Sequence, residues 1–424
     1  MDTPPFIHWI ESGEARSALW RSETGAAPAA RVVVADDAMT ADEAYGLACQ
    51  GTALLWRGDF QNARQMLQAL GNRADRQARK GKRPRAFAGA RIAGASEVAT
   101  TADTLRGSAE APSASAEAFN LHRQARSQRA RTLGSLLIPL DSDYKIPLRR
   151  APDVRVACAE AFGPAAEASV ISLQAVLGAI GAHEWRLKGI EIPAAGGRIH
   201  PHYGVFAPIR REYVQLVASA PLPAALTSTS VAFDIGTGTG VLAAVLARRG
   251  VRRVVATDRD PRALACAREN VERLGLAEQV EVVEADLFPP EGHAALVVCN
   301  PPWIPARPSS PIEGGIYDFE SRMLRGFLTA LPAHLEPEGE GWLILSDLAE
   351  HLGLRSRDEL LAAFESADLK VIDRIDVRPE HPKASDTTDP LHAARAAEVT
   401  SLWRLTVGAN IQRTSAIRSR SGSQ

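Results

Sequence analysis

The sequence predicts an α/β fold built around a mainly parallel sheet, and two neighbouring stretches carry this prediction. Residues 231–235 are apolar apart from one acid, and a glycine-rich turn and a helix-forming stretch, 241–249, follow them. Residues 253–258 are a second apolar run that ends on Asp258. In a nucleotide-binding βαβ unit an acid about 20 residues beyond the turn binds ribose hydroxyls. Asp258 has this spacing, so the stretch predicts a nucleotide-binding site.

The glycine turn alone does not decide the prediction. Its glycines alternate as G-x-G-x-G, whereas dinucleotide-binding folds use G-x-G-x-x-G, so a turn in another α/β domain is an alternative. Two later stretches add what the turn lacks. Residues 280–287 are predicted as a third strand that ends at an acid, and residues 295–299 as a fourth strand that runs into Asn-Pro-Pro-Trp at 300–303.

Together these four segments resemble the class I S-adenosylmethionine-dependent methyltransferases. The Asn300–Trp303 segment resembles the branch of that class that methylates planar nitrogens. The resemblance covers residues 201–407 and implies an α/β, Rossmann-like seven-stranded sheet with an antiparallel last strand pair. Residues 371–375 and 400–407 are the apolar runs expected to form that pair.

The resemblance implies S-adenosyl-L-methionine as cofactor and assigns residues to its three parts. The methionine moiety is expected at Asp234 and the turn, the ribose at Asp258, and the adenine at Asp286 and the Leu287 backbone. Carboxylates suit these roles because the ribose hydroxyls and the adenine amino group are hydrogen-bond donors. The predicted cofactor-binding residues are Asp234, Gly236, Gly238, Gly240, Asp258, Asp286 and Leu287.

Asn300, Pro301 and Trp303 are the predicted catalytic residues. An amide or aminopurine nitrogen is a poor nucleophile because its lone pair is delocalised. The Asn300 side-chain oxygen and the Pro301 carbonyl can accept hydrogen bonds from that NH2 group and draw the nitrogen towards sp3 geometry. The two prolines fix the turn, so these acceptors are preorganised. Trp303 can stack on a flat acceptor group.

The acceptor stays open at this point. Asn-Pro-Pro-Trp-Ile-Pro at 300–305 resembles the Asn-Pro-Pro-Tyr-Ile-Pro of release-factor glutamine methyltransferases, with Trp303 in place of tyrosine. Ribosomal RNA guanine N2-methyltransferases usually have phenylalanine there, and adenine N6 enzymes have tyrosine, phenylalanine or tryptophan. One alternative is a catalytically silent module that binds RNA or the ribosome. Another is a small-molecule methyltransferase, which the Pro-, Ser- and Gly-rich residues 304–317 favour.

With 424 residues, the chain is long enough for two or three domains. The N-terminal part is expected to be an α/β and helical accessory region. The predicted divisions are a small N-terminal accessory domain (1–72), a basic low-complexity linker (73–117), a helical region with a hairpin (118–200), the methyltransferase domain (201–408) and a disordered tail (409–424).

Charge and composition point to a macromolecular partner. The net charge is −1, yet residues 61–150 hold 17 Lys and Arg against 7 Asp and Glu. The basic segment 73–131 therefore predicts contact with nucleic acid, and a solvated linker is the alternative. A translation-related protein or RNA is the expected substrate. There is no apolar run of about 18 residues and the four cysteines are scattered, so we expect a cytoplasmic protein without a membrane span or metal site.

Overall fold

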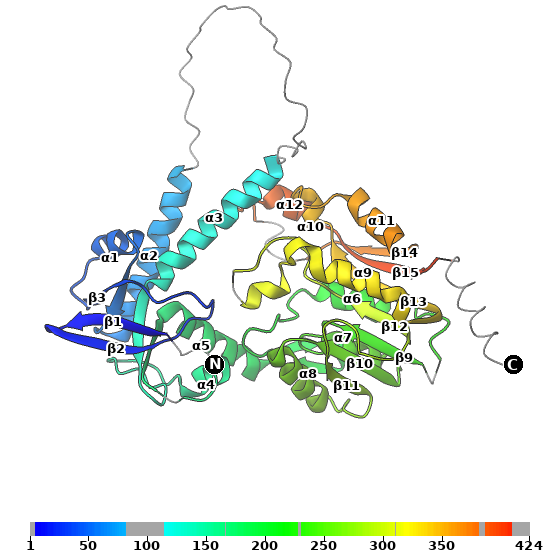
Figure 1. The fold of residues 1–424 in the computed structure, drawn as a ribbon, viewed down its shortest axis with the longest axis horizontal. Helices are drawn as coiled ribbons and strands as arrows, with labels where there is room; N and C mark the ends of the chain where they lie inside the picture. Colours follow the sequence, from blue (N-terminus) through cyan, green and yellow to red (C-terminus); the bar gives the residue numbers. More distant parts are fainter. Residues whose placement is uncertain are drawn as a thin grey trace, which may run out of the picture.

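The computed structural model describes residues 5–81, 114–165, 167–227, 230–309, 311–380 and 386–408 (Figure 1). Most of the predicted linker and the whole predicted tail therefore lie outside the described residues. The first part of that linker, 73–81, belongs to a helix that begins at Phe60. The described chain forms an N-terminal lobe and a C-terminal lobe, and one long helix, α3 (Ala114–Gly134), extends from the first towards the second (Figure 1).

The C-terminal lobe contains the predicted sheet. Within the described residues it has seven strands in the order β11-β10-β9-β12-β13-β15-β14. The first five run parallel, and β15 is antiparallel to both β13 and β14. This confirms the predicted seven-stranded sheet with an antiparallel end pair. The strands are β9 (Val231–Ile235), β10 (Arg253–Asp258), β11 (Val280–Glu284), β12 (Ala294–Cys299), β13 (Leu335–Ser346), β14 (Leu369–Val377) and β15 (Thr400–Val407).

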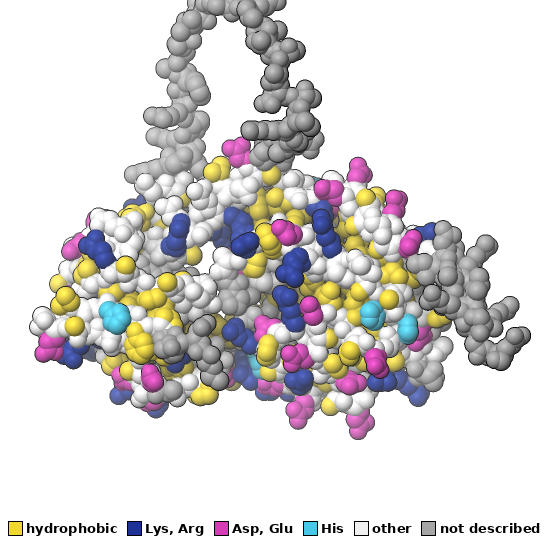
Figure 2. Space-filling view, in the orientation of Figure 1, with side chains coloured by type: hydrophobic (Ala, Val, Ile, Leu, Met, Phe, Trp, Pro, Cys, Tyr) yellow, Lys and Arg dark blue, Asp and Glu magenta, His cyan; other side chains and the backbone are white. Residues whose placement is uncertain are grey.

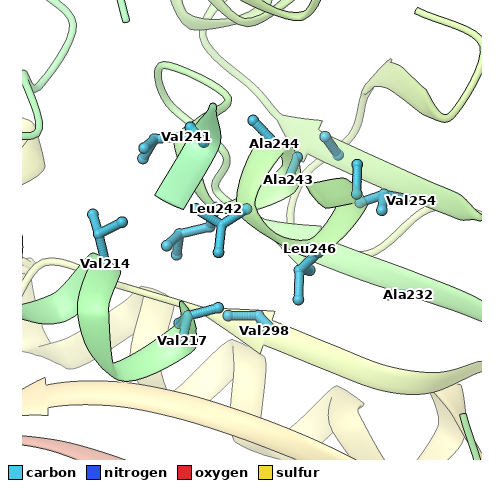
Figure 3. Packing of buried hydrophobic residues seen from close by; sticks show 14 of the residues in the cluster. Val214, Val217, Ala232, Val241, Leu242, Ala243, Ala244, Leu246, Val254 and Val298 are labelled. Atoms are coloured by element: carbon cyan, nitrogen blue, oxygen red, sulfur yellow. The ribbon is translucent and has the colours of Figure 1, made fainter. Parts of the chain in front are cut away.

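Helices cover both faces of this sheet because its central strands are apolar on both sides. Ala232 of β9 packs with α6 and α7, whereas Phe233 packs with α9 and α11 on the other face. Figure 3 shows the first of these two cores, with Val214 and Val217 of α6 lying against α7 and the sheet. The helices are α6 (Arg211–Ser219), α7 (Val241–Arg248), α8 (Pro261–Arg273), α9 (Arg322–His334), α10 (Leu348–His351), α11 (Arg357–Ser366) and α12 (His392–Ala397).

Local sequence explains where the helices next to the site begin. Asp260 accepts a hydrogen bond from the Arg262 amide and Pro261 occupies the first turn, so α8 starts at Pro261. Asp318 accepts hydrogen bonds from the amides of Met323 and Leu324 and so caps α9. Both acids satisfy amides that a helix leaves without internal partners.

The N-terminal lobe is a second sheet, and its composition differs from the sequence prediction. Within the described residues it has six strands in the order β1-β2-β6-β5-β4-β3. β5 and β6 come from the stretch that we expected to be mainly helical, so residues 6–56 and 136–172 share one sheet. Short apolar runs between helices do not reveal their state by periodicity. The strands are β1 (Phe6–Glu11), β2 (Glu14–Trp20), β3 (Arg31–Ala35), β4 (Thr52–Trp56), β5 (Leu136–Leu140) and β6 (Ser169–Ser172).

One face of this sheet is covered by helices, which bury Phe60, Leu70 and Leu133 against the strands. These helices are α1 (Ala41–Cys49), α2 (Phe60–Gly81), α3, α4 (Arg155–Phe162) and α5 (Leu173–Lys188). The predicted hairpin follows as β7 (Ile190–Ile192) and β8 (Gly197–Ile199) and leads into the C-terminal lobe. No helix in the described part of the chain is long and apolar enough to cross a membrane.

Candidate functional site

The glycine turn after β9 has a backbone that only glycine adopts readily. Gly236, Gly238 and Gly240 have φ angles of +71°, +55° and +79°. A Cβ atom on Gly236 would lie 2.4 Å from the methyl carbon at the flexible end of the Met323 side chain, so the positive φ angle is the stronger reason for glycine there. A Cβ on Gly238 would meet no atom within 4 Å. The turn is therefore open at Gly238, where a ligand can approach the backbone.

Asp258 lies at the carboxyl end of β10 and holds the turn in place. Its two carboxylate oxygens accept hydrogen bonds from the amides of Gly238 and Asp260, each at 3.0 Å. The Thr237 amide also donates to the carbonyl of Thr257, at 2.8 Å. Each carboxylate oxygen can accept more than one hydrogen bond, so the half-buried Asp258 retains capacity for two hydroxyl donors.

Asp234 is buried below the turn and is 1% exposed. Its Oδ2 atom accepts hydrogen bonds from the Thr237 hydroxyl at 2.6 Å and the Ala243 amide at 2.9 Å. Burial raises the pKa of Asp234 to about 6, although the two hydrogen bonds oppose this. The carboxylate thus ties the start of α7 to the glycine turn at an energetic cost.

Asp286 and Leu287 lie beyond the third strand. We expected that strand to reach residue 287, but β11 ends at Glu284, and the last ladder bond runs from the Ala285 amide to the Asp258 carbonyl. The Asp286 side chain is 80% exposed. Leu287 has a φ of +75°, and its carbonyl accepts a hydrogen bond from the Thr257 hydroxyl. Asp286 is therefore an exposed acid at the same edge of the sheet as Asp258.

These residues fit S-adenosylmethionine as a donor molecule. The parallel pairing of β9, β10 and β11 brings the turn, Asp258 and Asp286 to one edge of the sheet. That edge offers an open glycine backbone and two carboxylates, which match the amino, hydroxyl and adenine donors of such a molecule.

Asn300 lies next to the donor edge because β12 pairs with β9, with Cys299 opposite Ile235. The Trp303 indole N–H donates to the Asn300 Oδ1 atom at 2.9 Å. This bond fixes which end of the amide is the oxygen. The oxygen has two lone pairs and can still accept from a second donor. Pro301 is buried, which restricts the turn that carries the Asn300 side-chain carbonyl and the Pro301 backbone carbonyl.

Arg210, which precedes α6, supports Trp303 from a distant part of the chain. Its guanidinium carbon lies 4.7 Å from the centre of the indole ring. The same group pairs with Glu212 at 2.6 Å and with the buried Glu398 at 2.9 Å. Glu398 also accepts from the Ser346 hydroxyl at the end of β13, at 2.6 Å. One face of the Trp303 ring is thus covered by Arg210.

The sequence prediction did not include Arg210 or Glu398. Arg210 lies in a segment, 203–214, that loosely resembles one in the glutamine methyltransferases, and this was the only available signal. Glu398 gives no local signal, because its partners lie 188 and 52 residues away along the chain.

Comparison with known proteins agrees with this geometry. The family described as Methyltransferase small domain matches residues 197–368. A ribosomal protein L11 methyltransferase of Pelotomaculum thermopropionicum is 52% identical over 69 residues, which are 16% of this chain and 22% of that protein. A release factor glutamine methyltransferase of Geobacter sulfurreducens is 31% identical over 160 residues, 34% of this chain and 55% of that protein. The chain thus spans only part of these two relatives.

A third relative is covered more fully. A tRNA1(Val) (adenine(37)-N6)-methyltransferase of Shewanella amazonensis is 30% identical over 173 residues, which are 37% of this chain and 72% of that protein. All three matches cover less than half of this chain. The C-terminal lobe nevertheless carries the sheet order, the glycine turn and the family match together. The chain therefore belongs to the class I S-adenosylmethionine-dependent methyltransferases, in the family described as the methyltransferase small domain.

Proposed function

We propose that the protein is an N-methyltransferase that transfers a methyl group from S-adenosylmethionine to a planar amino or amide nitrogen. The observation that carries this proposal is the position of Asn300 at the end of β12, beside the β9 turn, with its oxygen oriented by Trp303. The donor molecule supplies a methyl group that is already activated on a sulfonium. The protein's remaining task is to hold the acceptor nitrogen and exclude water.

Asn300 and Pro301 perform that task. The Asn300 oxygen and the Pro301 carbonyl accept the two hydrogens of an NH2 group, which turns the nitrogen lone pair towards the donor edge. Trp303 keeps the Asn300 amide in the orientation that this contact requires, and Arg210 keeps Trp303 in place. On the donor side, Asp258, Asp286 and the Gly238 backbone hold the methyl donor, and Asp234 holds the turn.

A macromolecular acceptor, either a protein glutamine or an exocyclic nucleobase amine, agrees best with the observations. The names of the relatives refer to a ribosomal protein, release factors and a tRNA. Figure 2 shows Lys and Arg side chains gathered along the middle of one face, where the two lobes meet. Asp and Glu side chains lie among them, so this face is mixed in charge. A cytoplasmic location is part of the same proposal.

Transfer of labelled methyl groups tests this function. The purified full-length protein and S-adenosylmethionine with a labelled methyl are added to a lysate from cells that lack the protein, and RNA, protein and metabolites are then separated. We expect label in protein or RNA above that obtained with the Asn300→Ala variant at the same concentration. Label in metabolites alone would identify a small-molecule methyltransferase. No label, together with no calorimetric binding of the donor, would identify a silent module.

A further inference from the structure

Helix α3 of the N-terminal lobe packs on the loop that follows the Asn300–Trp303 segment. Phe119 of α3 is 3% exposed and is buried with Ile304, Leu348, Leu352 and Leu391 of the C-terminal lobe. Trp303 and Tyr317 pack against the edge of this cluster. The N-terminal end of α3 is thus part of a hydrophobic core of the other lobe, as its position beside α10 and α12 in Figure 1 suggests.

Arg123, one turn further along α3, contacts the same loop at three points. Its guanidinium carbon lies 4.2 Å from the centre of the Tyr317 ring. Its Nη2 atom donates to the Arg307 carbonyl at 2.6 Å and lies 3.9 Å from the Glu313 carboxylate. Glu313 in turn accepts from the amide and hydroxyl of Ser309, at 2.8 and 2.6 Å. One half-buried arginine therefore joins both limbs of the loop.

The loop also has hydrogen bonds of its own, and in its outer part the amides of Ile316 and Tyr317 both donate to the Glu313 carbonyl at 2.9 Å. The Ile304 amide donates to the Ile316 carbonyl, and the Asp318 amide donates to the Ile304 carbonyl. The two bonds of Ile304 close the base of the loop next to Trp303, and the contacts with Arg123 tie its outer part to α3. The loop lies directly after the proposed acceptor-binding turn, so its position decides which acceptors can reach Asn300.

We propose that Phe119 and Arg123 are positioning residues that hold residues 304–309 and 311–317 of the loop in their acceptor-binding arrangement, so that the two lobes form one acceptor site. The expected effect on acceptor kinetics rests on the proposed function, whereas the expected effect on the loop's structure does not. It gives the N-terminal lobe a role in acceptor selection, which the sequence left unassigned. A second contact between the lobes, from Arg186 of α5 to Glu269 of α8 at 2.6 Å, fixes the lobes at a point away from this loop.

Hydrogen exchange of the full-length protein tests the structural part without any catalysis. In Arg123→Ala we expect the amides of residues 304–318 to exchange about tenfold faster, because a cation–π contact and a charged hydrogen bond are lost together. Arg126→Ala is the matched control, since Arg126 is exposed on the same helix and is expected to leave the loop unchanged. Unchanged exchange in Arg123→Ala, or faster exchange spread over both lobes, would overturn the inference.

Kinetics test the functional part. For Arg123→Ala we expect kcat/KM for the acceptor to fall about tenfold while KM for the donor stays constant, and Arg123→Lys should recover part of the loss because it keeps the charge. If Arg123→Ala raised KM for the methyl donor by the same factor as it lowered kcat/KM for the acceptor, Arg123 would have a general structural role and the inference would be overturned. If the protein transfers no methyl group at all, the proposed function fails, while the exchange experiment still decides whether α3 holds the loop.

Discussion

The proposed methyl-donor side and the proposed acceptor side of the site are built from the chain in different ways. The donor side uses one continuous stretch, residues 234–287, in which strand, turn and helix follow each other and parallel pairing aligns the acids. The acceptor side joins Asn300 and Trp303 to Arg210, Glu398 and the 304–317 loop. The first is a local arrangement that the order of residues imposes. The second depends on contacts between distant segments and, through α3, between lobes.

This difference predicts that the two sides fail separately when single residues are changed. A change on the acceptor side should lower turnover and leave the affinity for S-adenosylmethionine unchanged. A change on the donor side should lower that affinity and affect turnover at saturating S-adenosylmethionine much less. The predictions below test that separation, and each names the result that would break it.

The largest effect is expected for Asn300→Ala. Loss of the side-chain oxygen removes a preorganised acceptor for the reacting NH2 group, so we expect turnover to fall on the order of 100-fold. Donor affinity should stay nearly constant, because the Asn300 side chain contacts Trp303 and the acceptor position. Labelled-methyl transfer and calorimetry with S-adenosylmethionine measure the two quantities. Retention of full turnover would remove Asn300 from its assigned role.

Asp258→Ala should show the opposite pattern. The change removes a carboxylate that can accept two hydroxyl donors, and donor affinity should fall roughly 10- to 100-fold. It also leaves the amides of Gly238 and Asp260 without their side-chain partner. Asp258→Asn is the matched variant, because it keeps one oxygen for the turn. Unchanged calorimetric binding in Asp258→Ala would mean that the donor lies elsewhere.

The contrast between local and long-range contacts also explains which parts of the fold and of the site could be predicted from the sequence. The seven-stranded sheet and its antiparallel end pair follow from the family resemblance, and the N-terminal cap of α8 follows from a local pattern, Asp260-Pro261. The positions of Asp258 and Asn300 at strand ends follow from local patterns too. Arg210 and Glu398 could not be found in this way, because a charged pair 188 residues apart leaves no periodic signal. The strands β5 and β6 were missed because short buried strands between helices lack an alternating pattern.

Asp234→Asn tests whether the donor turn is held at the expense of stability. Burial raises the pKa of Asp234 from 3.8 to about 6, so the folded state favours the protonated acid. The stabilising effect of this group is fully present below about pH 3.8 and is lost as the pH rises through about 6. The asparagine side chain of the variant does not ionise, so the free energy of unfolding of the Asp234→Asn variant does not fall in this way as the pH rises. At pH 8 we expect it to be more stable than the natural protein by roughly 1–3 kcal/mol, with weaker donor binding.

Denaturant unfolding between pH 4 and pH 8 measures this effect. The advantage of the Asp234→Asn variant should grow over that range and level off above pH 7. An advantage that stays constant with pH would show that Asp234 is not the titrating group. A variant that is less stable at every pH would show that the hydrogen bonds from Thr237 and Ala243 need a carboxylate.

The smallest effect is expected for Trp303→Phe, which separates the contribution of the indole N–H from that of the aromatic ring. Phenylalanine keeps a flat ring under Arg210 but lacks the N–H group that orients the Asn300 amide. Because a single neutral hydrogen bond contributes about 1 kcal/mol, kcat/KM for the acceptor should fall about fivefold, with no change in donor affinity. Trp303→Ala, which also removes the ring, should lower kcat/KM for the acceptor clearly more.

If both variants lose the same activity, the indole N–H accounts for the whole contribution of Trp303 to kcat/KM, and Arg210 does not act through the ring. If Trp303→Phe loses nothing, Asn300 is oriented by its backbone turn alone, and the acceptor side is more local than the contacts with Arg210 and Glu398 imply.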